Sequence, residues 1–150
     1  MSMSRRGSEA LPATSSSPEG VDVRANRTIL IVDDHEDVRH MLRLLFEVED
    51  FRVVGEAANG DQALDMAREH QPAFVILDYL MPNMTGEQTA RWIHLVDPGA
   101  RIIAVSGVLR EAPDWAEGFV SKSDVVELIQ LPETLLAQGS RAADHQAASG

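Results

Sequence analysis

The most constraining feature of the chain is a repeated alternation between short apolar runs and longer segments with helical periodicity. TILIV at 28–32, AFVIL at 73–77 and RIIAV at 101–105 are continuous apolar runs, as is typical of strands buried on both faces. FRVVGEAA at 51–58 and GFV at 118–120 complete five predicted strands. Strands separated by helices require right-handed crossovers, so we expect an α/β fold with a doubly wound, five-stranded parallel sheet and helices on both faces.

The segments between these strands carry the spacing of amphipathic helices. After the first strand, apolar residues recur at i, i+3, i+4, i+7 and i+8 and are expected to face the sheet: Val38, Met41, Leu42, Leu45 and Phe46. Helices are also predicted over 61–70 and 87–95, with turn residues between them and the strands. Asp124 can cap a last helix, which Pro132 must end, kink or restart.

One ordinary domain accounts for a chain of 150 residues with 44% hydrophobic content. Residues 1–27 are rich in Ser, Pro, Ala and Gly and lack apolar periodicity, so they are predicted to form a flexible N-terminal tail. The folded domain is expected at 28–136. The small and polar residues 137–150 are predicted to form a flexible C-terminal tail, too short for a DNA-binding or catalytic module.

Composition narrows the classes of function. A formal charge of −11 opposes direct binding to nucleic acid, because that affinity comes largely from Lys and Arg. No apolar run approaches the ~18 residues of a membrane span, and no signal-peptide pattern is present, so we expect a cytoplasmic protein without membrane insertion. The absence of cysteine excludes disulfides, zinc–thiolate sites and thiol nucleophiles.

Polar side chains follow four of the predicted strands. Asp33 and Asp34 follow the first strand, Asp78 the third, Ser106 the fourth and Lys122 the fifth. A parallel sheet brings these ends to one edge, where the five side chains are expected to surround a shallow cleft. Alone, an Asp-Asp pair indicates a solvated turn and a lysine a solvated surface position, but the ordered set favours a site.

This set of side chains is suited to phosphoryl chemistry. Neighbouring carboxylates repel one another, and a hard divalent cation favours their ionised forms, which makes Mg²⁺ the expected cofactor. The carboxylate of Asp78 can act as a nucleophile and form an aspartyl-phosphate if the charge on the phosphoryl oxygens is compensated. Mg²⁺, the Lys122 ammonium and the Ser106 hydroxyl are suited to that compensation.

At this point the chain resembles the response-regulator receiver family of two-component signalling, in particular its single-domain, chemotaxis-type members. The resemblance covers roughly 28–130 and rests on four segments: ILIVDDHEDVR at 29–39, VILDYLMPNMTG at 75–86, IIAVSG at 102–107 and GFVSK at 118–122. It implies a flavodoxin-like receiver fold. One departure is the short stretch between Ser106 and Lys122, which Pro113 interrupts, so the family's fourth helix is expected to be short or absent.

The resemblance implies a role for each residue near the metal. Asp78 would be the phosphoacceptor and a metal ligand, Asp34 a direct ligand, and Asp33 a ligand through water. Leu80 would contribute its backbone carbonyl to the metal. The side chains of Leu80 and Val108 would flank the path of the attacking water, and because both are apolar we expect slow self-dephosphorylation.

It also implies roles for residues around the acceptor. Ser106 would be the switch hydroxyl, and Lys122 would bind the phosphoryl group. Phe119 has two equally weighted interpretations, a plain core residue or an aromatic that changes rotamer with the switch. Pro82 and Gly86 would shape the loop after the acceptor. The five histidines show no metal-ligand spacing and are expected at the surface.

The function predicted from these features is a single-domain response regulator that switches conformation to control a partner protein. Its expected partners are a sensor histidine kinase or histidine phosphotransfer protein and an unknown effector, and homodimerisation is left open. Such a domain is a regulatory phosphoacceptor rather than an enzyme. One alternative is a phosphorelay intermediate or phosphate sink without an effector. Another is a haloacid-dehalogenase-like phosphatase, which Leu80 disfavours because that class needs a second acid at this position.

Overall fold

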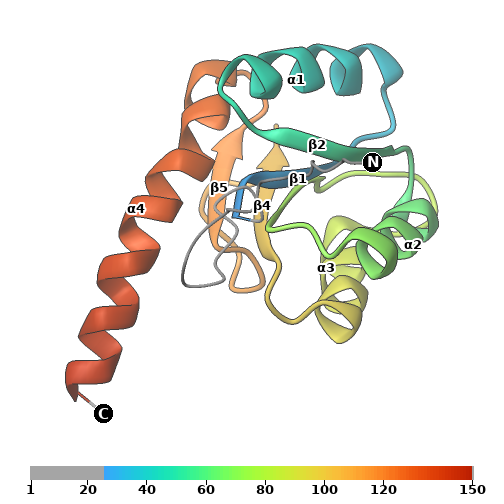
Figure 1. The fold of residues 1–150 in the computed structure, drawn as a ribbon. Helices are drawn as coiled ribbons and strands as arrows, with labels where there is room; N and C mark the ends of the chain where they lie inside the picture. Colours follow the sequence, from blue (N-terminus) through green and yellow to red (C-terminus); the bar gives the residue numbers. More distant parts are fainter. Residues whose placement is uncertain (1–25, 150) are drawn as a thin grey trace, which may run out of the picture.

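Five parallel strands form one sheet in the order β2-β1-β3-β4-β5 (Figure 1). The computed structural model describes residues 26–149, with side chains described as far as residue 138. The strands are β1 (Thr28–Val32), β2 (Arg52–Ala57), β3 (Phe74–Asp78), β4 (Arg101–Ser106) and β5 (Gly118–Ser121). The α-helices are α1 (Glu36–Val48), α2 (Gly60–His70), α3 (Gly86–Val96) and α4 (Val125–Ser149). The predicted fold class and parallel sheet are confirmed.

Alternate residues of the central strands face opposite helical layers. In β1, Ile29 and Ile31 pack in the cluster that includes α1 and α4, whereas Leu30 and Val32 pack in the cluster that includes α2 and α3. All residues of β1 and β3 are therefore buried, which explains why these strands are continuous apolar runs. None of the helices in the described part of the chain is long and apolar enough to cross a membrane.

The apolar stripe of α1 is narrower than the sequence predicts. Leu42 and Phe46 are buried and Val38 is half-buried, but Met41 and Leu45 are exposed. Residues at the centre of the apolar stripe of α1 point into the sheet. Residues at the edges of the stripe point sideways, between the helix and solvent, and are therefore less buried.

The segment 107–117 between β4 and β5 contains no helix, so the fourth helix that the receiver resemblance implies is absent. Trp115, within this segment, packs against the cluster formed with α2 and α3. Its ring stacks on that of Tyr79 with centroids 6.3 Å apart and an interplanar angle of 12°. An aromatic contact thus covers part of the sheet face that lacks a helix here.

The last helix is longer than the sequence predicts. Asp124 accepts a hydrogen bond from the backbone N–H of Glu127 at 3.0 Å, as expected of its cap. Pro132 lies inside α4 without ending it. The backbone of 137–149, predicted as a flexible tail, continues as helix to Ser149. Its alanine-rich composition explains this difference, because alanine has the highest intrinsic helix propensity.

The N-terminal tail predicted at 1–27 also needs a correction at its end. Residues 1–25 lie outside the described part of the chain, but Arg27 is held in place. Its guanidinium donates to the carbonyls of Glu49 (2.7 Å) and Asp50 (3.0 Å) and to the carboxylate of Glu133 (2.8 Å). It also lies 4.1 Å from the centre of the Phe51 ring. These contacts join Arg27 to residues far away in the sequence, so local sequence patterns could not predict them.

Candidate functional site

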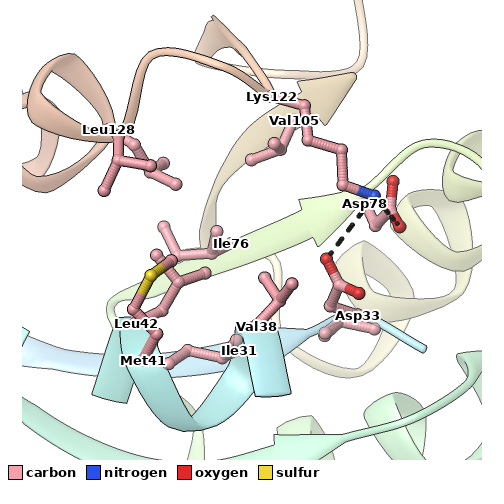
Figure 2. A pocket seen from close by; sticks show the side chains of 12 residues that line it. Ile31, Asp33, Val38, Met41, Leu42, Ile76, Asp78, Val105, Lys122 and Leu128 are labelled. Atoms are coloured by element: carbon pink, nitrogen blue, oxygen red, sulfur yellow. Dashed lines mark hydrogen bonds and ion pairs between the residues drawn. The ribbon is translucent and has the colours of Figure 1, made fainter. Parts of the chain in front are cut away.

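Parallel pairing places two buried carboxylates side by side. Asp33 follows β1 and Asp78 ends β3, and the register pairs Val32 with Leu77 just before them. Asp33 and Asp78 are only 4% and 2% exposed. Lys122 follows β5, and its Nζ lies 3.0 Å from Asp78 Oδ2 and 3.8 Å from Asp33 Oδ2 (Figure 2). The strand-end convergence predicted for these three residues is therefore observed.

Asp34 and His35 extend this arrangement toward solvent. The Nδ1 atom of His35 lies 3.2 Å from Asp33 Oδ1 and 3.1 Å from Asp34 Oδ1. Potential ligand atoms of Asp33, Asp34, His35 and Asp78 all lie within 4.8 Å of one another. We call these four residues the strand-end cluster.

Burial is the largest influence on the pKa of Asp78. It raises the pKa of Asp78, and the nearby charge of Asp33 adds to the increase, while the hydrogen bond from Lys122 opposes it. Burial lowers the pKa of Lys122, but the hydrogen bond to Asp78 and the charges of Asp33, Asp78 and Asp34 outweigh it, so the net change is an increase. Three carboxylates facing one ammonium leave a formal charge of −2, which a divalent cation would balance.

The donor set fits Mg²⁺, which prefers oxygen ligands. Carboxylates of Asp33, Asp34 and Asp78 are gathered within ligand range of one another. Asp78 Oδ1 accepts a hydrogen bond from the backbone N–H of Leu80 at 3.3 Å, which ties the carboxylate to the following loop. The side chain of Leu80 is largely exposed.

Gly86 allows the loop after the acceptor to return to β3. Its N–H donates to the carbonyl of Tyr79 at 2.9 Å. A Cβ at this position would lie 2.8 Å from the Cα of Tyr79 and 3.0 Å from the carbonyl oxygen of Asp78. Pro82 accepts from the N–H of Met84 at 2.8 Å within the same loop. Close backbone approach therefore requires glycine at 86.

Ser106 connects the end of β4 to the segment that follows it. Its buried Oγ accepts hydrogen bonds from the N–H groups of Val108 (2.9 Å) and Leu109 (3.0 Å). Its carbonyl accepts from the N–H of Lys122 at 3.0 Å. The hydroxyl predicted as a switch is thus engaged with the 107–117 segment, while the side chain of Val108 is exposed.

Phe119 is half-buried. The neighbouring Val120 packs in the cluster with α1 and α4, so Phe119 points to the opposite face, the one without a fourth helix. Both sequence interpretations of this aromatic, a core residue and a rotamer switch, stay predictions.

The structure adds two features that the sequence did not indicate. A cavity of about 90 Å³ lies between the sheet, α1 and α4, lined mainly by apolar side chains such as Ile31, Ile76 and Leu128 (Figure 2). It borders the carboxylates of Asp33 and Asp78. Arg39 donates to the carbonyl of Asp33 at 2.7 Å and holds the turn after β1. In the sequence, only the position of Arg39, one turn after the start of α1, could have suggested this contact.

The histidines differ from their predicted surface positions in one case. His94 is half-buried, with Nε2 3.1 Å from the carbonyl oxygen of Ala100, because α3 packs this side against the turn before β4. His35, His40 and His70 are exposed as predicted, and the side chain of His145 lies outside those described.

A family model for the response regulator receiver domain matches residues 29–130 of this chain. The chain belongs to the response-regulator receiver family. A candidate transcriptional regulator of Pseudomonas aeruginosa is 40% identical over 116 residues, which cover 73% of this chain and 56% of that protein. The chain therefore spans only about half the length of that relative.

Two further comparisons support the receiver assignment. The chemotaxis protein CheY of Halobacterium salinarum is 33% identical over 102 residues, covering 64% of this chain and 84% of CheY. The crystal structure of the response regulator TrrA of Thermotoga maritima in complex with Mg²⁺ and BeF has a TM-score of 0.61 and 26% identity. It covers 71% of this chain and 98% of that chain.

The receiver should not tolerate a side chain at Gly86. Gly86→Ala should lower the free energy of unfolding by about 1–3 kcal/mol, because its Cβ would overlap backbone atoms that cannot move aside. Gly99→Ala is a matched control, because a Cβ there meets no atom within 4 Å. Urea denaturation of the three proteins measures the effect, and equal stability of both variants would contradict it.

Removing the charge of Asp78 should stabilise the metal-free receiver at neutral pH. Because the folded-state pKa of Asp78 is raised, its ionisation is costly in the folded protein, and stability is lost as pH rises from the unfolded toward the folded pKa. In chelator at pH 7, Asp78→Asn should raise the Tm by roughly 2–4 °C, which corresponds to about 1 kcal/mol at this chain length. Calorimetry checks this, and an unchanged or lower Tm would contradict it.

Proposed function

We propose that this receiver accepts a phosphoryl group on Asp78 from the phosphohistidine of a sensor kinase or histidine phosphotransfer protein, and then controls an effector protein. The observation that carries the proposal is the contact between Lys122 Nζ and the buried Asp78 carboxylate, beside Asp33 and Asp34. The contact supports the proposal because the carboxylate that would attack, a cation and the expected metal ligands lie together at the carboxyl ends of the strands.

Each residue of the cleft has a part in the transfer. An Asp78 oxygen forms the bond to phosphorus as the phosphorus–nitrogen bond to the donor histidine breaks, and the bond pair stays with the imidazole. Lys122 remains beside the acceptor and pairs with the phosphoryl oxygens. Asp33, Asp34, Asp78 and the carbonyl of Leu80 would hold Mg²⁺, which when bound offsets the negative charge of the transferring group.

The switch would act through Ser106. Its hydroxyl now accepts from the amides of Val108 and Leu109. Donating to a phosphoryl oxygen would turn the hydroxyl toward Asp78 and release those amides, which loosens the 107–117 segment. Half-buried Phe119 would follow into the space beside it. The effector would then read this segment, which takes the place of the family's fourth helix.

A small phosphodonor such as acetyl phosphate, with Mg²⁺, should label the receiver with one phosphoryl group. Asp78→Ala should abolish labelling because it removes the attacking oxygen. Asp65→Ala removes an exposed carboxylate on α2 and should leave labelling unchanged. Intact mass spectrometry measures the stoichiometry, and full labelling of Asp78→Ala would refute the acceptor assignment.

The phosphorylated receiver should be long-lived, because the exposed side chains of Leu80 and Val108 cannot position water by hydrogen bonding. Replacing Leu80 with Asn and Val108 with Glu should shorten the lifetime by about 10-fold or more, since water-positioning groups typically contribute about 10²–10⁴-fold. Decay of labelled protein after donor removal gives the rate, with Val126→Glu as a control for a new exposed acid. A lifetime equal to that of the wild type would count against the proposal.

A further inference from the structure

We propose that the cavity between the sheet, α1 and α4 is a binding site for an uncharged, apolar molecule no larger than a single aromatic ring. This inference goes beyond the proposed function, because neither a metal ion nor a phosphoryl group takes part in the binding. The surface that binds is the apolar wall of the cavity, and the carboxylates border only one end of it.

Apolar side chains from three strands and two helices form that wall. The sheet contributes Ile31, Ile76 and Val105, and the helices contribute Leu42 and Leu128. All five residues are 5% exposed or less, and their side chains surround a common space (Figure 2). Such a wall offers water few hydrogen-bond partners and lacks atoms to pack against. An apolar guest would supply the missing contacts.

The charged groups at one end of the cavity explain why the guest is uncharged. Asp78 Oδ2 lies 3.0 Å from Lys122 Nζ, and Asp33 Oδ2 lies 3.8 Å from the same nitrogen. Asp33 Oδ1 also accepts a hydrogen bond from the N–H of His35 at 2.8 Å. A neutral guest leaves these contacts intact. A charged guest would have to break them or bury its charge against apolar side chains, which is costly.

The volume of the cavity limits the size of the guest. Apolar cavities of roughly 150 Å³ bind benzene or xenon, whereas this cavity measures about 90 Å³. A single ring therefore enters only if one wall yields. Met41 can provide that movement, because it lines the cavity, is 40% exposed and has a flexible, unbranched side chain. Two fused rings would need a larger rearrangement of the core.

The partly exposed lining residues indicate where the guest enters. Val38 and Met41 on α1 and Val125 at the start of α4 line the cavity, and each is in part accessible to solvent. The entrance is therefore expected between α1 and the first turn of α4. This is also the side on which a change of side chain can close the cavity without altering the sheet.

The cavity also touches the strands that carry the acceptor and the proposed switch. Val105 pairs with Asp78 in the register of β3 and β4 and directly precedes Ser106. Ile76 lies two residues before the acceptor on β3. A bound molecule would contact both strands, so the site is placed to influence the acceptor, although binding itself does not require phosphorylation.

Benzene is the probe for a direct test on the full-length protein. In ¹H–¹³C spectra of Ile, Leu and Val methyl groups, ring-current shifts should saturate as benzene is added. Nuclear Overhauser effects from benzene protons should reach the methyl groups of Ile31, Ile76 and Leu128. The methyl groups of Leu95 and Val126, which are 73% and 68% exposed, should show neither effect. This measurement needs no variant.

A matched pair of variants tests the location. Val125→Phe places a larger side chain at the cavity and should weaken benzene binding by about 10-fold or more, which corresponds to ~1.4 kcal/mol of binding free energy. Val126→Phe makes the same change at the next position, which is exposed and does not line the cavity, so the affinity should stay that of the wild type. Benzylamine and benzoate test the charge preference, and both should bind at least about 10-fold more weakly than benzene.

Saturable effects confined to the cavity methyl groups, lost in Val125→Phe and kept in Val126→Phe, support the proposal. Shifts that do not saturate up to the aqueous solubility of benzene, or equal effects at Leu95 and Val126, would overturn it. Equal affinities of the two Phe variants would count against the location, and tighter binding of benzylamine would refute the uncharged class. None of these readouts involves phosphodonor labelling, so failure of this site and failure of the proposed function are distinguishable.

Discussion

The burial of Asp33 and Asp78 beside a single ammonium group is the constraint on which the rest of this receiver depends. Two carboxylates at the ends of adjacent parallel strands cannot separate without breaking the sheet. Lys122, 3.0 Å from Asp78, offsets only part of their charge. A divalent cation would balance the remaining negative charge, as the proposed phosphoryl transfer requires.

The central strands and the segment 107–117 differ in how firmly the core holds them. The central strands are buried on both faces, so the positions of their ends are determined by the core. The segment 107–117 has no helix. Its contacts include two amide hydrogen bonds to Ser106, the hydrogen bond from the N–H of Glu117 to the carbonyl of Ile102 at 2.7 Å, and the stacking of Trp115 on Tyr79. A segment without regular secondary structure of its own suits the part that would change in the proposed switch.

The sequence by itself determined the five strands, their parallel arrangement and the set of polar residues at their ends, because continuous β-branched runs and the residues following them are local features. It also predicted that the usual fourth helix is short or absent, since Pro113 interrupts a short segment. Only the tertiary structure decided the contacts of Arg27 and Ser106, the stack of Trp115, the orientation of His35 and the apolar cavity beside the acids. These features depend on which distant residues a side chain meets after the segments pack together, and local periodicity indicates only which face of an element is buried.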